Sequence, residues 1–302
     1  MPIRYDITHT TVYRYQQPVS FGEHRVMFRP RDSHDLRVLA TDLQVSPDAI
    51  VRMIQDPHSN SVALVQPLAS ATELRIVCTF TIEQAQPSLV EPPLSPSAEF
   101  FPFAYTVEER FDLEHYLRPH HDDPQGRLTA WARQFIRTDG PTATRELLVQ
   151  MNQHIRDHFD YATRDEEGTQ SPTQTLELSR GTCRDFALLM MEAARRLGVA
   201  TRFVSGYLYD PALDGSDPAD GGTGIVGAGA THAWLQAYLP GAGWVPFDPT
   251  NNLLGSAQLI RVGVARDPSQ AAPISGVWYG PADAYLGMEA TVQVRRQPDP
   301  SG

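Results

Sequence analysis

The spacing of hydrophobic residues differs between two parts of this chain. From residue 2 to about residue 85, apolar and polar positions alternate in short runs, and no helical period appears. Alternation with a period of two is typical of strands that are buried on one face. The runs are Ile3–Tyr15, Arg25–Arg29, Arg37–Val45, Ser61–Val65 and Leu74–Glu83. We therefore predict an antiparallel β-sandwich-like domain over residues 1–85.

The pattern changes after a Pro-rich stretch at residues 86–102, which predicts an extended linker because proline interrupts regular helices. Apolar residues then recur at helical spacing in two segments, around Trp131 and around Met151. A third helix and several strands follow. Helices gathered before strands predict an α+β core over residues 103–265. Residues 266–302 are rich in Pro, Gly and Ala and predict a partly disordered C-terminal extension whose last six residues are disordered.

Cys183 lies in the predicted first turn of the third helix. Thr182 is a favourable N-cap residue, and Asp185 stands three positions after it, as in a capping box. Apolar residues recur from Phe186 to Leu197 at helical spacing, which predicts a buried helix. Unpaired N–H groups and the helix dipole at such a position stabilise a thiolate and can hold an oxyanion. A lone cysteine packed as a small apolar residue is the alternative interpretation.

His232 and Asp248 fall on two predicted strands. Alternating residues around His232 predict the first strand, Trp244–Asp248 predicts the second, and Pro240–Gly243 is a turn signal between them. A hairpin centred on Pro240 would set the two residues directly opposite each other on one face. Their Cβ atoms would then be roughly 5 Å apart, which suits an imidazole–carboxylate hydrogen bond. A surface histidine beside a turn aspartate is the alternative.

Composition narrows the possible partners. A chain of 302 residues with 41% hydrophobic content can bury two cores. The net charge of −11 argues against nucleic acid or an anionic membrane as the main partner. All 25 basic residues are arginine, so no lysine of this chain can accept an acyl group. The two cysteines cannot build a disulfide framework, and Cys78 lies on the apolar face of a predicted strand.

The sequence carries no membrane segment and no cofactor motif in a suitable context. No apolar run approaches the ~20 residues of a membrane span, and no leader-like run follows Met1, so we expect a cytoplasmic protein. Gly222–Gly227 matches G-x-G-x-x-G, but an acidic loop precedes it and a strand follows. His154 and His158 have the spacing of a zinc helix without the glutamate or a third ligand. We expect no cofactor and no metal. The His120–Asp123 segment predicts a solvated turn.

These motifs together resemble the bacterial transglutaminase-like family, which belongs to the papain-like cysteine protease superfamily. The resemblance covers about residues 140–255 and rests on G-x-C-x-D at the third helix, the strand Arg202–Tyr207, H-A-W, and G-W-x-x-x-D-P-T. The N-terminal stretch is similar to the region that precedes this core in bacterial members. The similar residues are Thr11-Val12-Tyr13-Arg14-Tyr15 with Pro18-Val19, His24, and Arg29-Pro30-Arg31.

The resemblance implies a papain-like core with the cysteine at a helix N-terminus and the histidine and aspartate on adjacent antiparallel strands. By position, Cys183 would be the nucleophile, His232 the general base and acid, and Asp248 the residue that orients the histidine. The implied reaction is acyl transfer on an amide or a peptide through a thioester. Hydrolysis and transamidation both stay open, because a fold and a triad do not fix the substrate. The expected partner is a protein or peptide substrate.

Further assignments rest on fewer residues. The Cys183 N–H is expected to form half of the oxyanion hole, and Tyr161 is a candidate for the second donor; the alternative is a core tyrosine. Trp234 and Trp244 either wall the acyl site or fill the core. Residues 210–230 are expected to form a flexible loop, either a flap over the site or a solvated insertion. The competing functional class is a non-enzymatic transglutaminase-like scaffold that binds a partner protein, although such a scaffold would not need an intact triad.

Overall fold

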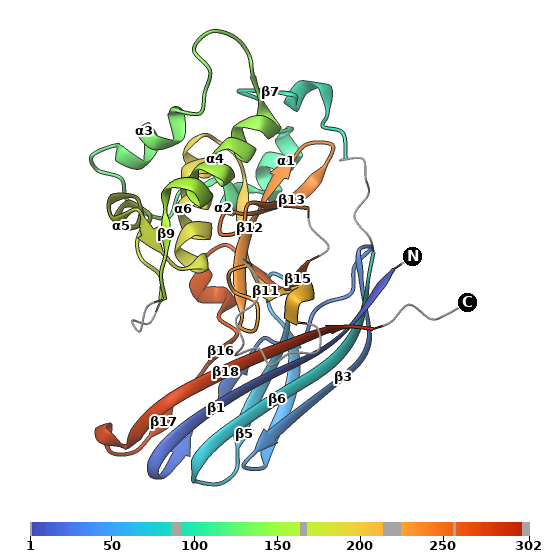
Figure 1. Ribbon diagram of the computed structural model, residues 1–302, viewed down its shortest axis with the longest axis vertical. Helices are drawn as coiled ribbons and strands as arrows, with labels where there is room; N and C mark the ends of the chain where they lie inside the picture. The colour runs from blue at the N-terminus through green and yellow to red at the C-terminus, as the bar shows by residue number, and fades with distance from the viewer. Residues whose placement is uncertain (1, 86–91, 164–167, 214–224, 256–257, 298–302) are drawn as a thin grey trace.

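The middle of the chain forms an α+β core, and both ends of the chain build a β unit beside it (Figure 1). The computed structural model describes residues 2–85, 92–163, 168–213, 225–255 and 258–297. The fold class is α+β with mostly antiparallel sheets, as the sequence predicts. None of the helices in these described ranges has the length and apolarity needed to cross a bilayer.

Two antiparallel sheets form the β unit. One has the strand order β17-β1-β6-β3 with β18 also paired to β1, and the other has the order β16-β2-β5-β4. Residues such as Ile7, Val65 and Ile76 alternate into one apolar core. The strands are β1 (Ile3–Phe21), β2 (His24–Val26), β3 (Leu36–Ser46), β4 (Ala49–Gln55), β5 (Ser61–Pro67), β6 (Ala71–Gln84), β16 (Ile274–Ser275), β17 (Trp278–Tyr279) and β18 (Tyr285–Arg296). The period of two in the sequence is therefore the alternation between core and surface.

The C-terminal segment is part of this β unit, which corrects the prediction of a separate extension over residues 266–302. Strand β18 pairs with β1 from Tyr5 to Tyr15, and β17 pairs with the far end of β1. The ring of Trp278 packs 5.2 Å from that of Tyr15. Of the six residues expected to be disordered, Gln297 donates a backbone hydrogen bond to β1, and the other five lie outside the described residues. Pairing on both sides keeps β1 from being an exposed edge.

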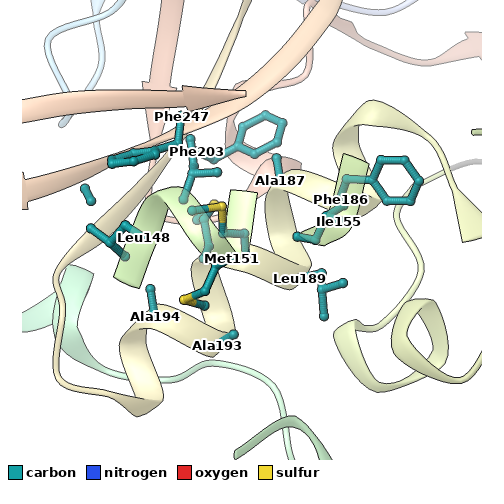
Figure 2. Close-up of a cluster of buried hydrophobic side chains, with 14 of the residues drawn as sticks. Leu148, Met151, Ile155, Phe186, Ala187, Leu189, Ala193, Ala194, Phe203 and Phe247 are labelled. Atoms are coloured by element: carbon teal, nitrogen blue, oxygen red, sulfur yellow. The ribbon is translucent and has the colours of Figure 1, made fainter. Parts of the chain in front are cut away.

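The α+β core is built around helix α6 (Cys183–Arg196). Strands β11 and β12 lie against one side of this helix, and α3, α4 and α5 lie against the other (Figure 1). Figure 2 shows Met151 and Ile155 of α4 beside α6, with Phe203 and Phe247 contributed by the sheet. All residues of α6 are buried except Arg184, which is exposed, and Arg196, which is half-buried, as suits a helix that other elements cover on most sides.

The remaining elements complete the core. Its main sheet is antiparallel with the order β14-β13-β12-β11-β15, and two short strand pairs, β7–β8 and β9–β10, lie outside it. The helices are α1 (Val107–Asp112), α2 (Glu114–Leu117), α3 (Arg127–Arg133), α4 (Thr144–His158) and α5 (Pro172–Leu178). The strands are β7 (Phe100–Phe101), β8 (Thr142–Ala143), β9 (Asp160–Tyr161), β10 (Arg180–Gly181), β11 (Thr201–Leu208), β12 (His232–Leu239), β13 (Gly243–Asp248), β14 (Leu253–Leu254) and β15 (Leu259–Ala265).

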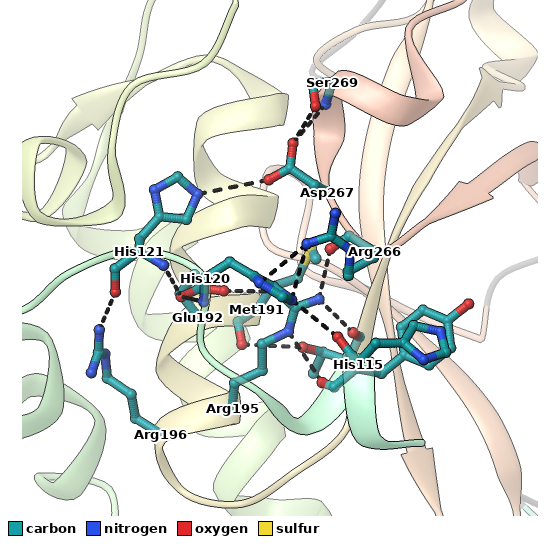
Figure 3. Close-up of polar contacts among 12 residues, drawn as sticks. His115, His120, His121, Met191, Glu192, Arg195, Arg196, Arg266, Asp267 and Ser269 are labelled. Carbon is teal, nitrogen blue, oxygen red and sulfur yellow. Dashed lines mark hydrogen bonds and ion pairs between the residues drawn. The ribbon is translucent and has the colours of Figure 1, made fainter. Parts of the chain in front are cut away.

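A buried ion pair anchors the C-terminal end of α6. Nη1 of Arg195 lies 2.8 Å from Oε1 of Glu192, and both side chains are 0% exposed. Arg195 also donates to three backbone carbonyls, and Glu192 accepts hydrogen bonds from the backbone N–H groups of His120 and His121 (Figure 3). Full pairing is what makes such burial tolerable. The prediction of a solvated turn at His120 is therefore wrong, since this turn is tied to the helix that carries Cys183.

Candidate active site

Cys183 is the first residue of α6, and a capping box fixes the backbone around it. Oδ2 of Asp185 accepts hydrogen bonds from the backbone N–H and the hydroxyl of Thr182, each at 2.9 Å. Gly181 permits this approach, because a Cβ atom there would lie 2.8 Å from the Cβ of Asp185. Cys183 is 7% exposed. It is thus held where the helix dipole is positive and backbone N–H groups lack intrahelical partners.

His232 and Asp248 form a buried pair. Nε2 of His232 lies 2.9 Å from Oδ2 of Asp248, and both side chains are 0% exposed. The carboxylate accepts two further hydrogen bonds at 3.0 Å, from the backbone N–H of Thr250 to Oδ1 and from Nδ2 of Asn251 to Oδ2. These contacts fix the carboxylate and, through it, the imidazole. Nδ1 of His232 is left as the ring nitrogen for a further partner.

The hairpin that carries this pair has a different register from the predicted one. Strands β12 and β13 pair about Gly241, not about Pro240. Continuing their pairing sets Trp234 opposite Asp248, so His232 lies two residues further along the same face and reaches the carboxylate diagonally. The predicted face is therefore right and the directly opposed pairing is wrong. The turn decides this, because Gly241 takes the left-handed conformation with φ of +90°.

The pair holds a proton strongly. Burial lowers the pKa of His232, but the charge and hydrogen bond of Asp248, together with interactions with Cys183, outweigh burial and raise it from 6.5 to about 10. Nδ1 makes no hydrogen bond of standard geometry with a described residue. Contacts between a catalytic thiol and its histidine often tighten only when substrate binds. At neutral pH the ring is therefore an imidazolium, which favours a neighbouring thiolate and has a proton to donate.

Tyr161 lies next to the start of the cysteine helix. It pairs with Gly181 in the short parallel ladder of β9 and β10, and its ring meets Phe186 with 6.4 Å between centroids. Tyr161 is 38% exposed. Partial burial, and then the charge of Cys183, raise the pKa of its hydroxyl to about 12. The hydroxyl therefore stays protonated at physiological pH and can donate a hydrogen bond.

The two tryptophans named from the sequence have different surroundings. Trp234 is buried and stacks on His232, with 5.9 Å between ring centroids and 27° between planes. It supports the imidazole from within a small apolar cluster. Trp244 lies at the turn end of the hairpin, opposite Tyr238 and under the guanidinium of Arg202 at 4.1 Å. Six residues of strand, roughly 20 Å, separate Tyr238 from His232, so the structure does not bring Trp244 into the site.

Sequence reasoning did not identify two residues that contact the pair. Asn251 donates to Asp248, as described above. Gly227 lies against His232, because a Cβ atom at Gly227 would be 2.7 Å from Nδ1. The signal for Asn251 was its place just after Asp-Pro-Thr, since asparagine in turns commonly bonds nearby backbone groups. Gly227 was considered only as the end of an unsuitable dinucleotide motif and as part of the loop expected over residues 210–230.

The other titratable groups of the described residues have different surroundings. Among the residues that the structure describes, no three His, Cys, Asp or Glu side chains gather in a way that could hold a metal. His154 and His158 instead stack on each other, with 4.1 Å between ring centroids. Cys78 lies in the β unit, where burial raises the pKa of its thiol to about 11. Cys78 is thus a neutral, packed thiol at physiological pH.

Comparison with known proteins gives the same picture of two parts. Residues 129–249 match the transglutaminase-like superfamily, and residues 5–83 match the bacterial transglutaminase-like N-terminal region. An uncharacterized protein of Mycobacterium leprae is 28% identical over 97% of this chain and 99% of its own length. A second, from Mycobacterium tuberculosis, is 27% identical over 91% and 88%. A crystal structure from Cytophaga hutchinsonii, described as a candidate cysteine protease, has a TM-score of 0.70 at 18% identity and covers 100% of this chain and 93% of its own.

Proposed function

Because this chain joins a bacterial transglutaminase-like N-terminal region to a core of the transglutaminase-like superfamily, we propose that it catalyses cysteine-dependent acyl transfer from amide or peptide bonds. Cys183 is the nucleophile, His232 the acid and base, and Asp248 the orienting carboxylate. The observation that carries this proposal is the buried 2.9 Å contact between His232 and Asp248. It holds a protonated imidazole whose pKa is raised partly by Cys183.

The first half-reaction forms a thioester. Cys183 reacts as a thiolate beside the His232 imidazolium, and Sγ attacks the carbonyl carbon of the substrate. In the tetrahedral intermediate the carbonyl oxygen carries the negative charge. The imidazolium then donates its proton to the departing amine, the C–N bond breaks, and the acyl group remains on Cys183. Asp248 keeps the ring oriented for both proton transfers.

The second half-reaction releases the acyl group. Water or a primary amine attacks the thioester carbon while His232 takes its proton. The C–S bond breaks and releases the Cys183 thiolate, while the proton stays on His232 as in the starting state. Water gives a carboxylic acid, and an amine gives a new amide. Because the chain has no lysine, an acceptor side-chain amine has to come from another molecule.

The oxyanion is stabilised at the start of α6. The backbone N–H of Cys183 belongs to the first helical turn, where it has no intrahelical acceptor. Tyr161 is our candidate for the second donor, since its hydroxyl stays protonated and its strand adjoins the helix start. Two donors aimed at a developing charge are the usual arrangement for acyl transfer.

The substrate class follows from this chemistry. A glutamine carboxamide and a peptide bond both place an amide nitrogen as the leaving group. The description of the Cytophaga hutchinsonii protein as a candidate cysteine protease is the reason to include peptide bonds. The protein substrate is the partner that this proposal requires.

A test that needs no known substrate compares the alkylation of Cys183 by iodoacetamide from about pH 5 to about pH 10, a range that spans ordinary imidazole and thiol titration. We expect fast labelling below pH 7 in wild type and its collapse in His232→Ala. Cys78 serves as the internal control, because burial keeps it a neutral thiol. A slow, ordinary thiol that His232→Ala leaves unchanged would contradict the proposal and favour a binding scaffold.

Analysis of the products distinguishes hydrolysis from transamidation. Glutamine-containing peptides are incubated with the protein, with and without a fluorescent primary amine, and are analysed by mass spectrometry. Hydrolysis converts glutamine to glutamate or cleaves the chain, whereas transamidation adds the amine. Cys183→Ala must abolish either product, and a product that persists in this variant would not come from the proposed chemistry.

A further inference from the structure

The side chain of Asn251 joins two parts of the site. Its Nδ2 donates to Oδ2 of Asp248 at 3.0 Å and to the backbone oxygen of Val226 at 3.0 Å, and its Oδ1 accepts from the Val226 N–H at 2.8 Å. Both protons of Nδ2 are thus used. The amide cannot be reversed, because its oxygen would then face two acceptors.

The segment held in this way lies on the catalytic histidine. Gly227 follows Val226 with φ of +95°, and a Cβ atom there would lie 2.7 Å from Nδ1 of His232 and 3.4 Å from two ring carbons. Both the backbone conformation and the contact therefore require glycine. The ring is thus bounded by Asp248 at Nε2 and by Gly227 at Nδ1.

The same segment is attached to the β unit at its other end. The carbonyl of Gly229 accepts a hydrogen bond from the N–H of Val292 at 2.9 Å, and Val292 lies in β18. Residues 225–229 are half-buried. Within the loop expected over 210–230, residues 225–229 are thus not a solvated insertion, whereas Pro211, Ala212 and Ala230 are exposed. Residues 225–229, which we call the wall, are held at one end by Asn251 of the core and at the other end by Val292 of the β unit.

We propose that Asn251 is a positioning residue for the reaction: through one carboxamide it sets the Asp248 carboxylate and holds Val226, so that Gly227 lies on the Nδ1 edge of His232. This inference rests on the proposed function, because it concerns how the imidazole is aimed at Cys183. The described hydrogen bonds of Asn251 go to Asp248 and Val226 and not to Cys183, so its effect passes through Asp248 and Gly227. Losing one hydrogen bond to a charged group is expected to slow the chemistry by about tenfold to a hundredfold.

The neighbouring asparagine supplies a matched control. Asn252 stands in the same turn, and its Oδ1 accepts a hydrogen bond from Asn152 at 2.9 Å. No described hydrogen bond joins it to Asp248 or Val226. Since Asn252 has φ of +54°, Asn252→Gly removes the side chain without straining the turn.

Asn251→Asp gives the sharpest comparison, because it keeps the shape of the side chain. A protonated carboxyl group can still donate its one proton to Asp248, although it leaves the Val226 carbonyl without its donor, whereas an ionised one places a second negative charge beside Asp248. We therefore expect the Cys183 alkylation rate of this variant, relative to wild type, to be highest at low pH. The ratio should fall by about tenfold or more as the new carboxyl group ionises. A role in folding alone would not give this pH profile.

The experiment measures alkylation of Cys183 against pH, and amide hydrogen exchange in residues 225–229, for wild type, Asn251→Ala, Asn251→Asp and Asn252→Gly. Support consists of slower alkylation and faster exchange in both Asn251 variants, with Asn252→Gly like wild type. Rate ratios that match Asn252→Gly at every pH, or unchanged exchange, would overturn the proposal. If Asn251→Ala does not fold, Asn251→Asp carries the test. A wild-type thiol that is slow and indifferent to His232→Ala would count against the proposed function instead, and exchange would still decide whether Asn251 holds the wall.

Discussion

Nε2 of His232 lies 2.9 Å from Oδ2 of Asp248, and water reaches neither side chain. Burial alone would remove the proton from this imidazole, yet the charge of Asp248 and the contact with Cys183 raise its pKa to about 10. The aspartate therefore does more than orient the ring. It keeps the ring charged in a place that would otherwise favour the neutral form.

Replacing Asp248 with asparagine should reverse this balance. The shape is kept and the charge is lost, so we expect the pKa of His232 to fall below its ordinary 6.5 because burial then dominates. In wild type the imidazolium is present below about pH 10 and is lost as the pH rises through that value; in Asp248→Asn it is lost in the acid range. Alkylation of Cys183 at neutral pH should slow toward the rate of an ordinary thiol, by about tenfold to a hundredfold, because a free thiol with a pKa of about 8.5 is only a few per cent thiolate at pH 7. An unchanged alkaline limb in the pH profile would refute this account.

The raised pKa of His232 should also make the free energy of unfolding depend on pH. Since the folded pKa of His232 lies above the unfolded one, the pair stabilises the folded protein fully below about pH 6.5 and loses this contribution as the pH rises to about 10. The difference in unfolding free energy between wild type and Asp248→Asn, measured by urea denaturation, should shrink over that interval. A difference that is constant with pH would mean that the charge is not responsible.

Tyr161→Phe separates the two proposed oxyanion donors. If the hydroxyl of Tyr161 contacts the developing oxyanion, its removal should lower kcat by about 10²–10³-fold. KM and the unfolding midpoint should change little, because Tyr161 is 38% exposed. Turnover of a peptide substrate by wild type and variant measures this, once product analysis has found a substrate. Equal kcat values would place the second donor elsewhere.

Gly181→Ala should disturb the start of the cysteine helix. The new methyl group would lie 2.8 Å from the Cβ of Asp185 and 3.3 Å from the ring of Phe186, so the backbone has to move. We expect a loss of about 1–3 kcal/mol of stability together with slower alkylation of Cys183. Gly140→Ala is the matched control, because no atom lies within 4 Å of the added methyl group. Equal melting temperatures for the two variants would contradict the contact.

Arg195→Met should be among the most destabilising single changes. It leaves Glu192 charged, buried and without its partner at 2.8 Å, a situation that costs about 3–5 kcal/mol. Arg14→Met breaks the pair between Arg14 and Glu289, whose side chains are 50% and 60% exposed, and should cost less than about 1 kcal/mol. Chemical denaturation of both variants gives the comparison. Similar losses would show that burial does not control the strength of these pairs.

Local signals in the sequence predicted the parts of the site that depend on neighbouring residues. Thr182 and Asp185 predict that a helix begins at Cys183, and the structure has that capping box. The even separation of His232 and Asp248 predicted a shared face. It did not predict their pairing, because the hairpin was expected to be centred on Pro240. The left-handed turn at Gly241 sets the register instead.

The sequence did not predict contacts between residues that are far apart along the chain. Trp244 looks like a site residue in sequence, but the guanidinium of Arg202 and the ring of Tyr116 surround it at the far end of the hairpin. Strand β18 shows alternation at Ala290, Val292 and Val294, yet nothing nearby in sequence indicates that its partner is the first strand of the chain. The contacts of Asn251 likewise depend on a segment that approaches from before β12.

The pairing of β1 with β18 also determines when the protein can finish folding. Gln297 bonds Asp6 at 2.7 Å across 291 residues of sequence, so this edge of the sheet closes only after the whole stretch between these two residues has left the ribosome. Closing so large a loop is slow, whereas the helices around Cys183 need only contacts within the core. In the interval β1 presents an unpaired edge along its length, available to β1 of another chain. Refolding yield should therefore fall with protein concentration, and aggregation should begin at the β unit while the thiol-bearing core is already native.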